Sequence, residues 1–339
     1  MTSIHDLARE TGVSTATVSR ALRGLPRVSP DTRERVLDAA VRLGYTPSPH
    51  AVGLASGGRT RTIAIVVLWV TRWYFSTVVH GAESLLRERG YDVLLYNIGG
   101  DAEARRRVLL TQLLTKRADA VMVVGFTPTP EEVLWLGRHD VPAVTLGARV
   151  DEWPSVRIDD ENVARVAVEH LVALGHRRIA YVGQLSDDGL DLATPRDRLH
   201  GYRESLRAAG VDPEESLEFD GGFTLDGGRE AGRRLLQLRE RPTAVFCASD
   251  EMAYGVLRSC LEAGVDVPRE MSVIGVDGHD MAGFFDLTTV EQPVEQQGRA
   301  AARHLLQRLD PDDGEVGLVE HVEVPTRLVV RGTTGPACA

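Results

Sequence analysis

Residues 4–24 read IHDLARETGVSTATVSRALRG, and this stretch decides how the amino-terminal part of the chain folds. Ser3 stands just before it with Asp6 three positions later, a capping-box pattern that starts a short helix. A glycine then ends this helix, and Ser14 can cap a second helix over residues 15–22. The second helix has one apolar side and one side of small or polar residues. Two helices joined by a tight glycine-containing turn predict a helix-turn-helix that presents its second helix to the DNA major groove.

A third short helix completes a predicted domain over residues 1–45. Ser29-Pro30 supplies an N-cap and a first-turn proline, and the amphipathic run ends at Gly44. Residues 1–61 contain nine arginines and five acidic residues, a formal charge of +4. The alternative is that these are the first helices of a larger α/β enzyme with solvated surface arginines. The local positive charge favours an anionic partner at this end instead.

The rest of the 339-residue chain has the opposite charge. All 39 basic and 49 acidic residues together give −10, so the part after residue 61 carries −14. With 43% hydrophobic and 26% charged residues, the composition fits a globular protein and excludes disorder, collagen and coiled coil, and the length allows two or three domains. Because no apolar run reaches roughly 18 residues and the start lacks a secretory pattern, we expect a cytoplasmic protein without a membrane partner.

The cysteines and histidines predict neither a disulfide framework nor a metal site. Cys247, Cys260 and Cys338 are too scattered, and we interpret the first two as small core residues and the third as part of a tail over residues 334–339. The ten histidines include no convincing metal pair. Nucleophile-elbow, phosphate-loop and zinc-protease motifs are also missing, so we expect no catalytic residues, no metal and no cofactor.

Two motifs in order, residues 4–24 and then VSPDTRERVLDAAVRLGYTP at 28–47, resemble the lactose-repressor (LacI/GalR) family of bacterial transcription regulators. The resemblance continues to about residue 333 and implies that Thr15, Ala16 and Arg20 read bases. An arginine can contact guanine O6 and N7 together, which is worth roughly 1 to 3 kcal/mol of discrimination. Three further residues are expected to contact phosphate or to pack: Thr17, Ser19 and Arg23.

Residues 46–61 join the head to the body and contain a possible short helix after Ser48-Pro49. About eight residues are too few for a stable isolated helix. The resemblance implies a hinge helix that pairs with its twin in a dimer and enters the minor groove, with Leu54 as the wedge and Ala51 as the close-packing residue. The sequence departs from the common family pattern in two places, which carry Ser48 and Val52. A plain Gly/Pro linker is the alternative.

From residue 62 onward, short apolar runs such as TIAIVV and DAVMVV alternate with amphipathic segments, which predicts parallel sheets covered by helices on both faces. The resemblance implies an α/β body of the periplasmic-binding-protein type I fold over residues 62–333. It divides the body into two lobes, 62–158 plus 291–320 and 159–288 plus 321–333. Ligands of such folds bind in the crevice at the carboxyl ends of the strands.

Several residues that follow strands match family positions for effector binding: Trp73, Tyr74, Phe75, Asp159, Arg198, Phe223, Ser249, Asp250 and Asp277. Carboxylates and a guanidinium suit a polyhydroxylated molecule, and aromatic faces suit the apolar side of a sugar. Asp159 could instead only cap the helix that follows it, and Phe75 and Phe223 could be core. Ser249 replaces an asparagine that sugar-binding relatives often carry, so a nucleobase corepressor stays open as an alternative.

These observations predict a ligand-responsive, sequence-specific DNA-binding regulator. One head reads only a few base pairs, so we expect a homodimer on a near-palindromic double-stranded DNA operator, and most simply a repressor released by a sugar. No leucine heptad follows residue 333 and GTTGPACA at 332–339 is short, so we expect no tetramer built by a C-terminal helix bundle. The alternative from another class is a solute-binding protein, against which the helix-turn-helix argues.

Overall fold

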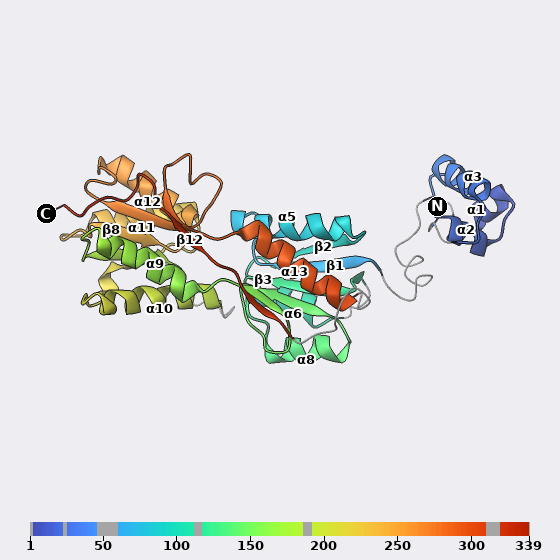
Figure 1. The fold of residues 1–339 in the computed structure, drawn as a ribbon, viewed down its shortest axis with the longest axis horizontal. Coiled ribbons are helices and arrows are strands. Elements are labelled where there is room, and N and C mark those ends of the chain that lie inside the picture. The colour runs from blue at the N-terminus through green and yellow to red at the C-terminus, as the bar shows by residue number, and fades with distance from the viewer. Residues whose placement is uncertain are drawn as a thin grey trace. The chain divides into compact units, whose positions relative to one another are not determined.

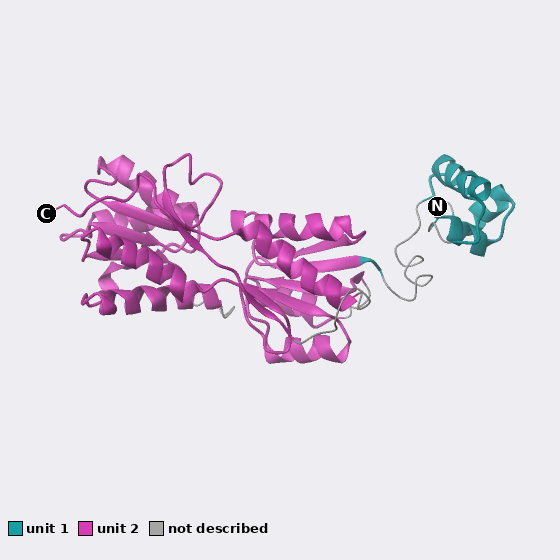
Figure 2. Ribbon diagram, in the orientation of Figure 1, with its two compact units in different colours: residues 1–61 teal, residues 62–339 magenta. Residues whose placement is uncertain are grey.

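The computed structural model describes residues 3–22, 26–45, 60–111, 117–185, 192–309 and 319–338. Its two compact units, residues 1–61 and 62–339, are shown in Figure 2 and are described separately below. The predicted DNA contact Arg23 and the predicted hinge residues lie outside the described residues: Ser48, Ala51, Val52 and Leu54.

The first unit contains three helices, α1 (Ile4–Thr11), α2 (Thr15–Leu22) and α3 (Pro30–Arg42). Ser3 and Asp6 form the predicted capping box at the start of α1, because each side chain accepts a hydrogen bond from the other residue's backbone N–H. The two predicted helices of the helix-turn-helix are therefore present, and the first begins at the predicted cap.

A small apolar core holds the three helices of the first unit together. Leu7 of α1, Val18 of α2 and Val36 of α3 are fully buried and pack against one another's helices. On α2, Ala16 and Arg20 are exposed. The helix thus buries its apolar side inside the unit and leaves its small and basic side open to a partner.

The second unit contains two six-stranded sheets, each the centre of one lobe. The first lobe has, in spatial order, strands β11 (His321–Glu323), β5 (Ser155–Arg157), β4 (Ala143–Leu146), β3 (Ala120–Val124), β1 (Thr62–Val67) and β2 (Asp92–Asn97). The second lobe has strands β12 (Arg327–Val329), β10 (Thr288–Glu291), β9 (Ser272–Asp277), β8 (Ala244–Cys247), β6 (Ile179–Gly183) and β7 (Glu218–Asp220). All described strand pairs are parallel except β10 with β12.

Helices cover the sheets of both lobes, as Figure 1 shows. The first lobe carries α5 (Trp73–Glu88), α6 (Ala102–Leu109), α8 (Pro130–Arg138) and α13 (Val294–Leu309). The second lobe carries α9 (Asp160–Ala173), α10 (Ala193–Ala208), α11 (Leu225–Leu236), α12 (Asp250–Ala263) and the 3-10 turn η1 (Glu215–Leu217). No helix in the described ranges is both long and apolar enough to cross a membrane.

The chain crosses between the lobes a few residues later than predicted at two of its three crossings. Thr288–Glu291 pairs with β9 and so belongs to the second lobe. His321–Glu323 pairs with β5 and so belongs to the first lobe, although we predicted that the second lobe begins again at residue 321. Both strands are short, and their assignment depends on a distant pairing partner that the local sequence does not reveal.

Helices α5 and α13 pack closely because glycines face the partner backbone. A Cβ added at Gly81 of α5 would lie 2.2 Å from the carbonyl oxygen of Glu295 in α13. A Cβ added at Gly298 of α13 would lie 2.2 Å from the carbonyl oxygen of Val78 in α5. Backbone cannot give way as a side chain can, so these glycines set the spacing of the two helices.

We therefore expect Gly298→Ala to destabilise the protein by about 1 to 3 kcal/mol through overpacking. Gly137→Ala is the matched control, because Gly137 lies in α8 with no heavy atom within 4 Å of an added Cβ. That substitution should stabilise slightly, by up to about 1 kcal/mol, because alanine favours the helix. Urea unfolding of both variants measures the difference, and equal midpoints would contradict the close-packing interpretation.

Candidate functional site

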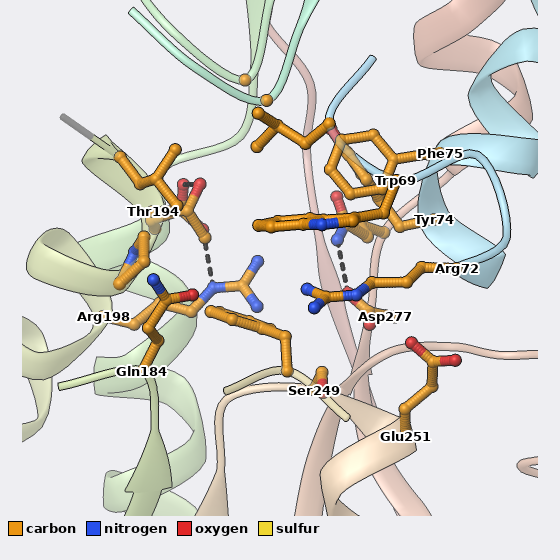
Figure 3. Close-up of a pocket in the computed structure, with 18 of the residues that line it drawn as sticks. Trp69, Arg72, Tyr74, Phe75, Gln184, Thr194, Arg198, Ser249, Glu251 and Asp277 are labelled. Carbon is orange, nitrogen blue, oxygen red and sulfur yellow. Dashed lines mark hydrogen bonds and ion pairs between the residues drawn. The ribbon is translucent and has the colours of Figure 1, made fainter. Parts of the chain in front are cut away.

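A pocket lies between the two lobes at the carboxyl ends of their strands (Figure 3). It encloses about 740 Å³ of space outside protein atoms, with open solvent at its mouth included. Leu68 follows β1, Ser249 follows β8 and Asp277 ends β9, so both sheets contribute to its wall. This is the place where the parallel-sheet topology predicts ligand binding.

The centre of the second-lobe wall is a buried ion pair. Arg198 of α10 is only 3% exposed, and its Nε donates to Asp160 Oδ1 at 2.7 Å. A second guanidinium nitrogen donates to the carbonyl oxygen of Ala248, while the Thr194 hydroxyl donates to Asp160 Oδ2 at 3.1 Å. Burial alone would lower the pKa of Arg198, but Asp160 and Asp277 outweigh it and raise the pKa. The guanidinium therefore stays charged and is held in one orientation.

Asp277 is the second buried acid of the pocket. It lies at the end of β9 with a φ of 125°, a conformation that favours glycine. Its Oδ1 accepts a hydrogen bond of 2.7 Å from the Gln292 amide, whose own oxygen accepts one of 2.9 Å from Gln297 of α13. Burial raises the pKa of Asp277 to about 7, although Arg198 and the Gln292 hydrogen bond oppose the shift. This carboxyl therefore changes its charge near neutral pH.

Aromatic rings form much of the first-lobe wall. Tyr74 and Phe75 occupy the first turn of α5 and meet edge to face with centroids 5.3 Å apart. Phe75 also meets Trp69 edge to face at 6.1 Å. The Arg72 guanidinium lies 3.8 Å from the Trp69 ring centroid. Figure 3 shows that Arg72 and Arg198 point into the cavity from opposite sides.

Six of the nine predicted effector residues line this pocket: Tyr74, Phe75, Arg198, Phe223, Ser249 and Asp277. Phe75 is 7% exposed, so it both borders the cavity and packs in the core of the first lobe. Ser249 borders the cavity, but its hydroxyl accepts from the Met252 backbone N–H and caps α12. The cap thus uses this hydroxyl as an acceptor and leaves its O–H to donate.

The other three predicted residues lie outside the lining. Asp159 caps α9, where its Oδ1 accepts from the Asn162 backbone N–H at 2.9 Å, and the adjacent Asp160 faces the cavity instead. Our placement of Asp159 in the pocket is corrected by one residue, because the helix cap takes its carboxylate. Trp73 points toward the other lobe, where its Nε1 bonds Asp280.

Asp250 is fully buried beneath the pocket and makes structural contacts. Thr289 donates its hydroxyl to Oδ1 at 2.7 Å, and the His279 backbone N–H donates to Oδ2 at 2.8 Å. Burial and the nearby Asp277 raise the pKa of Asp250 well above its usual range. Asp250 therefore does not line the pocket as we expect from the sequence. Its carboxyl instead links α12 to β10 and to the loop after β9.

Sequence reasoning missed several lining residues, among them Trp69, Arg72, Asp160, Gln184, Thr194, Glu251, Gln292 and Gln297. Gln184 and Gln292 directly follow β6 and β10, so strand ends alone could have found them. Trp69 and Asp160 lie two and three residues after β1 and β5. Gln297 carries no such signal, because it lies inside α13. Among the residues that the structure describes, no group of three or more His, Cys, Asp or Glu side chains could hold a metal ion.

The candidate DNA-contacting residues of α2 differ in their accessibility. Ala16 and Arg20 are exposed, whereas Thr15, Thr17 and Ser19 are half-buried. The Thr17 hydroxyl lies 2.9 Å from the Ser14 hydroxyl, which in turn accepts from the Thr17 backbone N–H. Thr17 thus participates in the cap of the helix.

Comparison with known proteins finds family models that match two separate parts of the chain. Residues 3–48 match the model of bacterial regulatory proteins of the lacI family, and residues 168–334 match the periplasmic binding protein-like domain. Catabolite control protein A of Priestia megaterium is 33% identical over 337 residues, which cover 98% of this chain and 99% of that protein.

Solved structures of regulators share the fold over nearly the whole chain. The complex of the transcriptional regulator CelR with cellobiose superposes with a TM-score of 0.72 at 32% identity, over 98% of this chain and 100% of that one. The lac repressor dimer bound to operator and the anti-inducer ONPF has a TM-score of 0.81 at 28% identity, over 98% of this chain and 99% of that one.

The pKa of Asp277 predicts a specific pH dependence of stability. The folded protein retains a proton on this carboxyl that the unfolded chain releases, so stability from this group falls as pH rises from 3.8 toward about 7. The slope is up to about 1.4 kcal/mol per pH unit. Asp277→Asn should remove this contribution and lose less stability than the wild type between pH 5 and 7 in urea unfolding.

Gln292→Leu provides the second arm of this experiment. Its amide hydrogen bond lowers the pKa of Asp277, so the variant should shift the midpoint of the pH dependence upward. Parallel stability curves for the wild type and Asp277→Asn would contradict a raised pKa at this position.

Proposed function

Because this chain belongs to the lacI family of bacterial regulatory proteins and is a ligand-responsive, DNA-binding transcriptional regulator, we propose that it represses genes of carbohydrate uptake or catabolism until a sugar binds between its lobes. The observation that carries the proposal is the pocket wall, which combines a fixed guanidinium, two buried carboxyls and aromatic rings in one cavity. Such a wall offers bidentate hydrogen bonds and apolar faces to a polyhydroxylated ring. We assign no catalytic step to the cavity and place the protein with its DNA in the cytoplasm.

The sugar assignment rests on the geometry of the polar groups. Arg198 has its Nε bound to Asp160, and its remaining donors are oriented by the Ala248 carbonyl. A sugar hydroxyl beside Arg198 can accept a hydrogen bond from the guanidinium and donate one to a carboxylate. Neighbouring hydroxyls on a neutral sugar ring can make several such pairs of bonds. The 32%-identical CelR structure contains cellobiose, which supports the same ligand class here.

DNA recognition is assigned to the exposed side of α2 in a homodimer. Arg20 is long enough for a bidentate contact to guanine, whereas Ala16 can contact a thymine methyl group. Two heads related by a twofold axis then read the two halves of a near-palindromic operator. The lac repressor structure contains a dimer on its operator, which supports this arrangement.

The effector signal is proposed to pass through the angle between the lobes. A ligand that binds the closed lobes more tightly than the open ones shifts their equilibrium by its differential affinity. A coupling of about 1 to 3 kcal/mol between effector and operator is typical of such regulators. The segment 46–61 would transmit this change to the head in a dimer.

We expect Arg20→Ala to weaken binding to the specific operator by about 1 to 3 kcal/mol and to relax sequence preference. Arg9→Ala is the charge-matched control, since Arg9 lies on α1 beside Asp6 at 3.5 Å. It should change affinity for specific and random DNA alike, through phosphate electrostatics alone. Titrations against operator and scrambled duplexes at two salt concentrations separate the two effects. Equal specificity ratios for both variants would remove Arg20 from base reading.

A thermal-shift screen of the full chain with cellobiose, ribose, other neutral sugars and nucleobases tests the pocket. A sugar should raise the melting temperature and weaken operator binding, and Asp277→Ala should abolish that shift. Asp159→Asn should keep it, because asparagine still caps α9 and this side chain lies outside the pocket. A nucleobase that strengthens operator binding would favour the corepressor alternative, and an absent operator footprint would favour a solute-binding protein.

A further inference from the structure

Trp73 packs at the edge of the first-lobe core, and its side chain also reaches the second lobe. It is the first residue of α5, and its indole Nε1 donates to Asp280 Oδ2 at 3.2 Å across the cleft. The indole also lies against the His279 ring, with centroids 4.8 Å apart and planes inclined by 31°. Both partners are in the loop that follows β9 of the second lobe. The contact therefore exists only while the lobes are together.

The backbone of Trp73 reaches the second lobe as well. Arg72, the N-cap of α5, makes no side-chain cap hydrogen bond, so the first N–H groups of the helix need another acceptor. The Glu251 carboxyl, at the start of α12 in the second lobe, stands near this helix start. Burial raises the pKa of Glu251, while the Arg72 charge and the Trp73 backbone N–H oppose the shift. An acid of one lobe thus faces the positive N-terminal end of a helix of the other.

The residues next to this anchor are the ones that face the pocket. Tyr74 and Phe75 follow Trp73 directly and both line the cavity, as does Glu251. A shift of the first turn of α5 relative to the second lobe therefore displaces Tyr74 and Phe75 in the pocket wall. Trp73 and these two aromatic residues move together, because they occupy the same helical turn.

We propose that Trp73 is a positioning residue that couples closure of the two lobes to the shape of the effector pocket, through its indole contacts with Asp280 and His279. This inference rests on the proposed function, since it assigns the regulation of that same cavity. Trp73 does not touch the ligand; it stabilises the closed arrangement in which Tyr74 and Phe75 meet it. When the lobes separate, the indole hydrogen bond and the ring contact are lost together.

The test uses hydrogen–deuterium exchange of the full chain, which needs no effector. Trp73→Phe keeps a ring beside His279 but removes the donor to Asp280, and Asp280→Ala removes the acceptor. Each single variant should speed exchange by about threefold or more on both sides of the cleft, at the first turn of α5 and in the loop 278–283. The double variant should add little to either single variant, because one shared contact has been removed.

Trp135→Phe is the matched control, because Trp135 of α8 stacks at 4.0 Å on His139, the C-cap residue of the same helix, and so contacts one lobe only. Its loss should leave exchange at α5 and at the loop 278–283 unchanged. Wild-type exchange at the loop 278–283 in Trp73→Phe, or additive effects in the double variant, would overturn the proposal.

A second measurement separates this inference from the proposed function. With cellobiose as the probe, Trp73→Phe should speed dissociation by about threefold to tenfold, while Trp135→Phe should not. If the wild type binds neither cellobiose nor any other sugar of the thermal-shift screen, the sugar assignment fails, and the exchange data still decide the role of Trp73. If the wild type responds to cellobiose but Trp73→Phe shows wild-type exchange, only the positioning role is lost.

Discussion

The pocket depends on keeping one guanidinium charged in a place where water hardly reaches it. A buried charge without a partner is costly, so Arg198 requires Asp160, and both require the fixed positions of α9 and α10. Removing either partner would leave the other charge exposed to a low-dielectric interior. The pair is therefore better understood as an orienting device than as a source of stability, since an apolar pair of the same size could fill the space more cheaply. Its orientation is what a ligand would recognise.

Features set by local chemistry could be predicted from the sequence with good precision. The Ser3–Asp6 capping box, the Ser29-Pro30 helix start and the fully buried runs of β1 and β3 all follow from neighbouring residues. A parallel strand covered on both faces must be apolar throughout, so the alternation of such runs with helices already indicates the architecture. Short strands such as Glu218–Asp220 and His321–Glu323 carry mixed polarity, and only their distant partners make them strands.

The pocket was predictable to the level of segments but not always to the level of side chains. Asp159 and Asp160 are consecutive acids before one helix, and the sequence alone does not tell which one caps and which one faces the cavity. The backbone at the start of α9 resolves this, because the cap position turns Asp159 back toward the Asn162 N–H. Trp73 illustrates the complementary limit: it was expected beside Tyr74 in the wall, yet one step around a helix turns a side chain by about 100° and here directs it to the other lobe.

Two sets of contacts join the lobes, and they differ in how strongly they depend on the angle between the lobes. On the hinge side, Gln297, Gln292 and Asp277 form a chain of hydrogen bonds around a segment where the polypeptide itself crosses between lobes. Covalent continuity keeps these groups near one another at any lobe angle, so their bonds discriminate weakly between open and closed forms. Trp73 meets Asp280 across a separation of 207 residues, and neither residue belongs to a segment that crosses between the lobes. A change of lobe angle can therefore break this contact while the Gln292 hydrogen bonds persist. A regulator that needs only about 1 to 3 kcal/mol of coupling can draw it from a few such contacts.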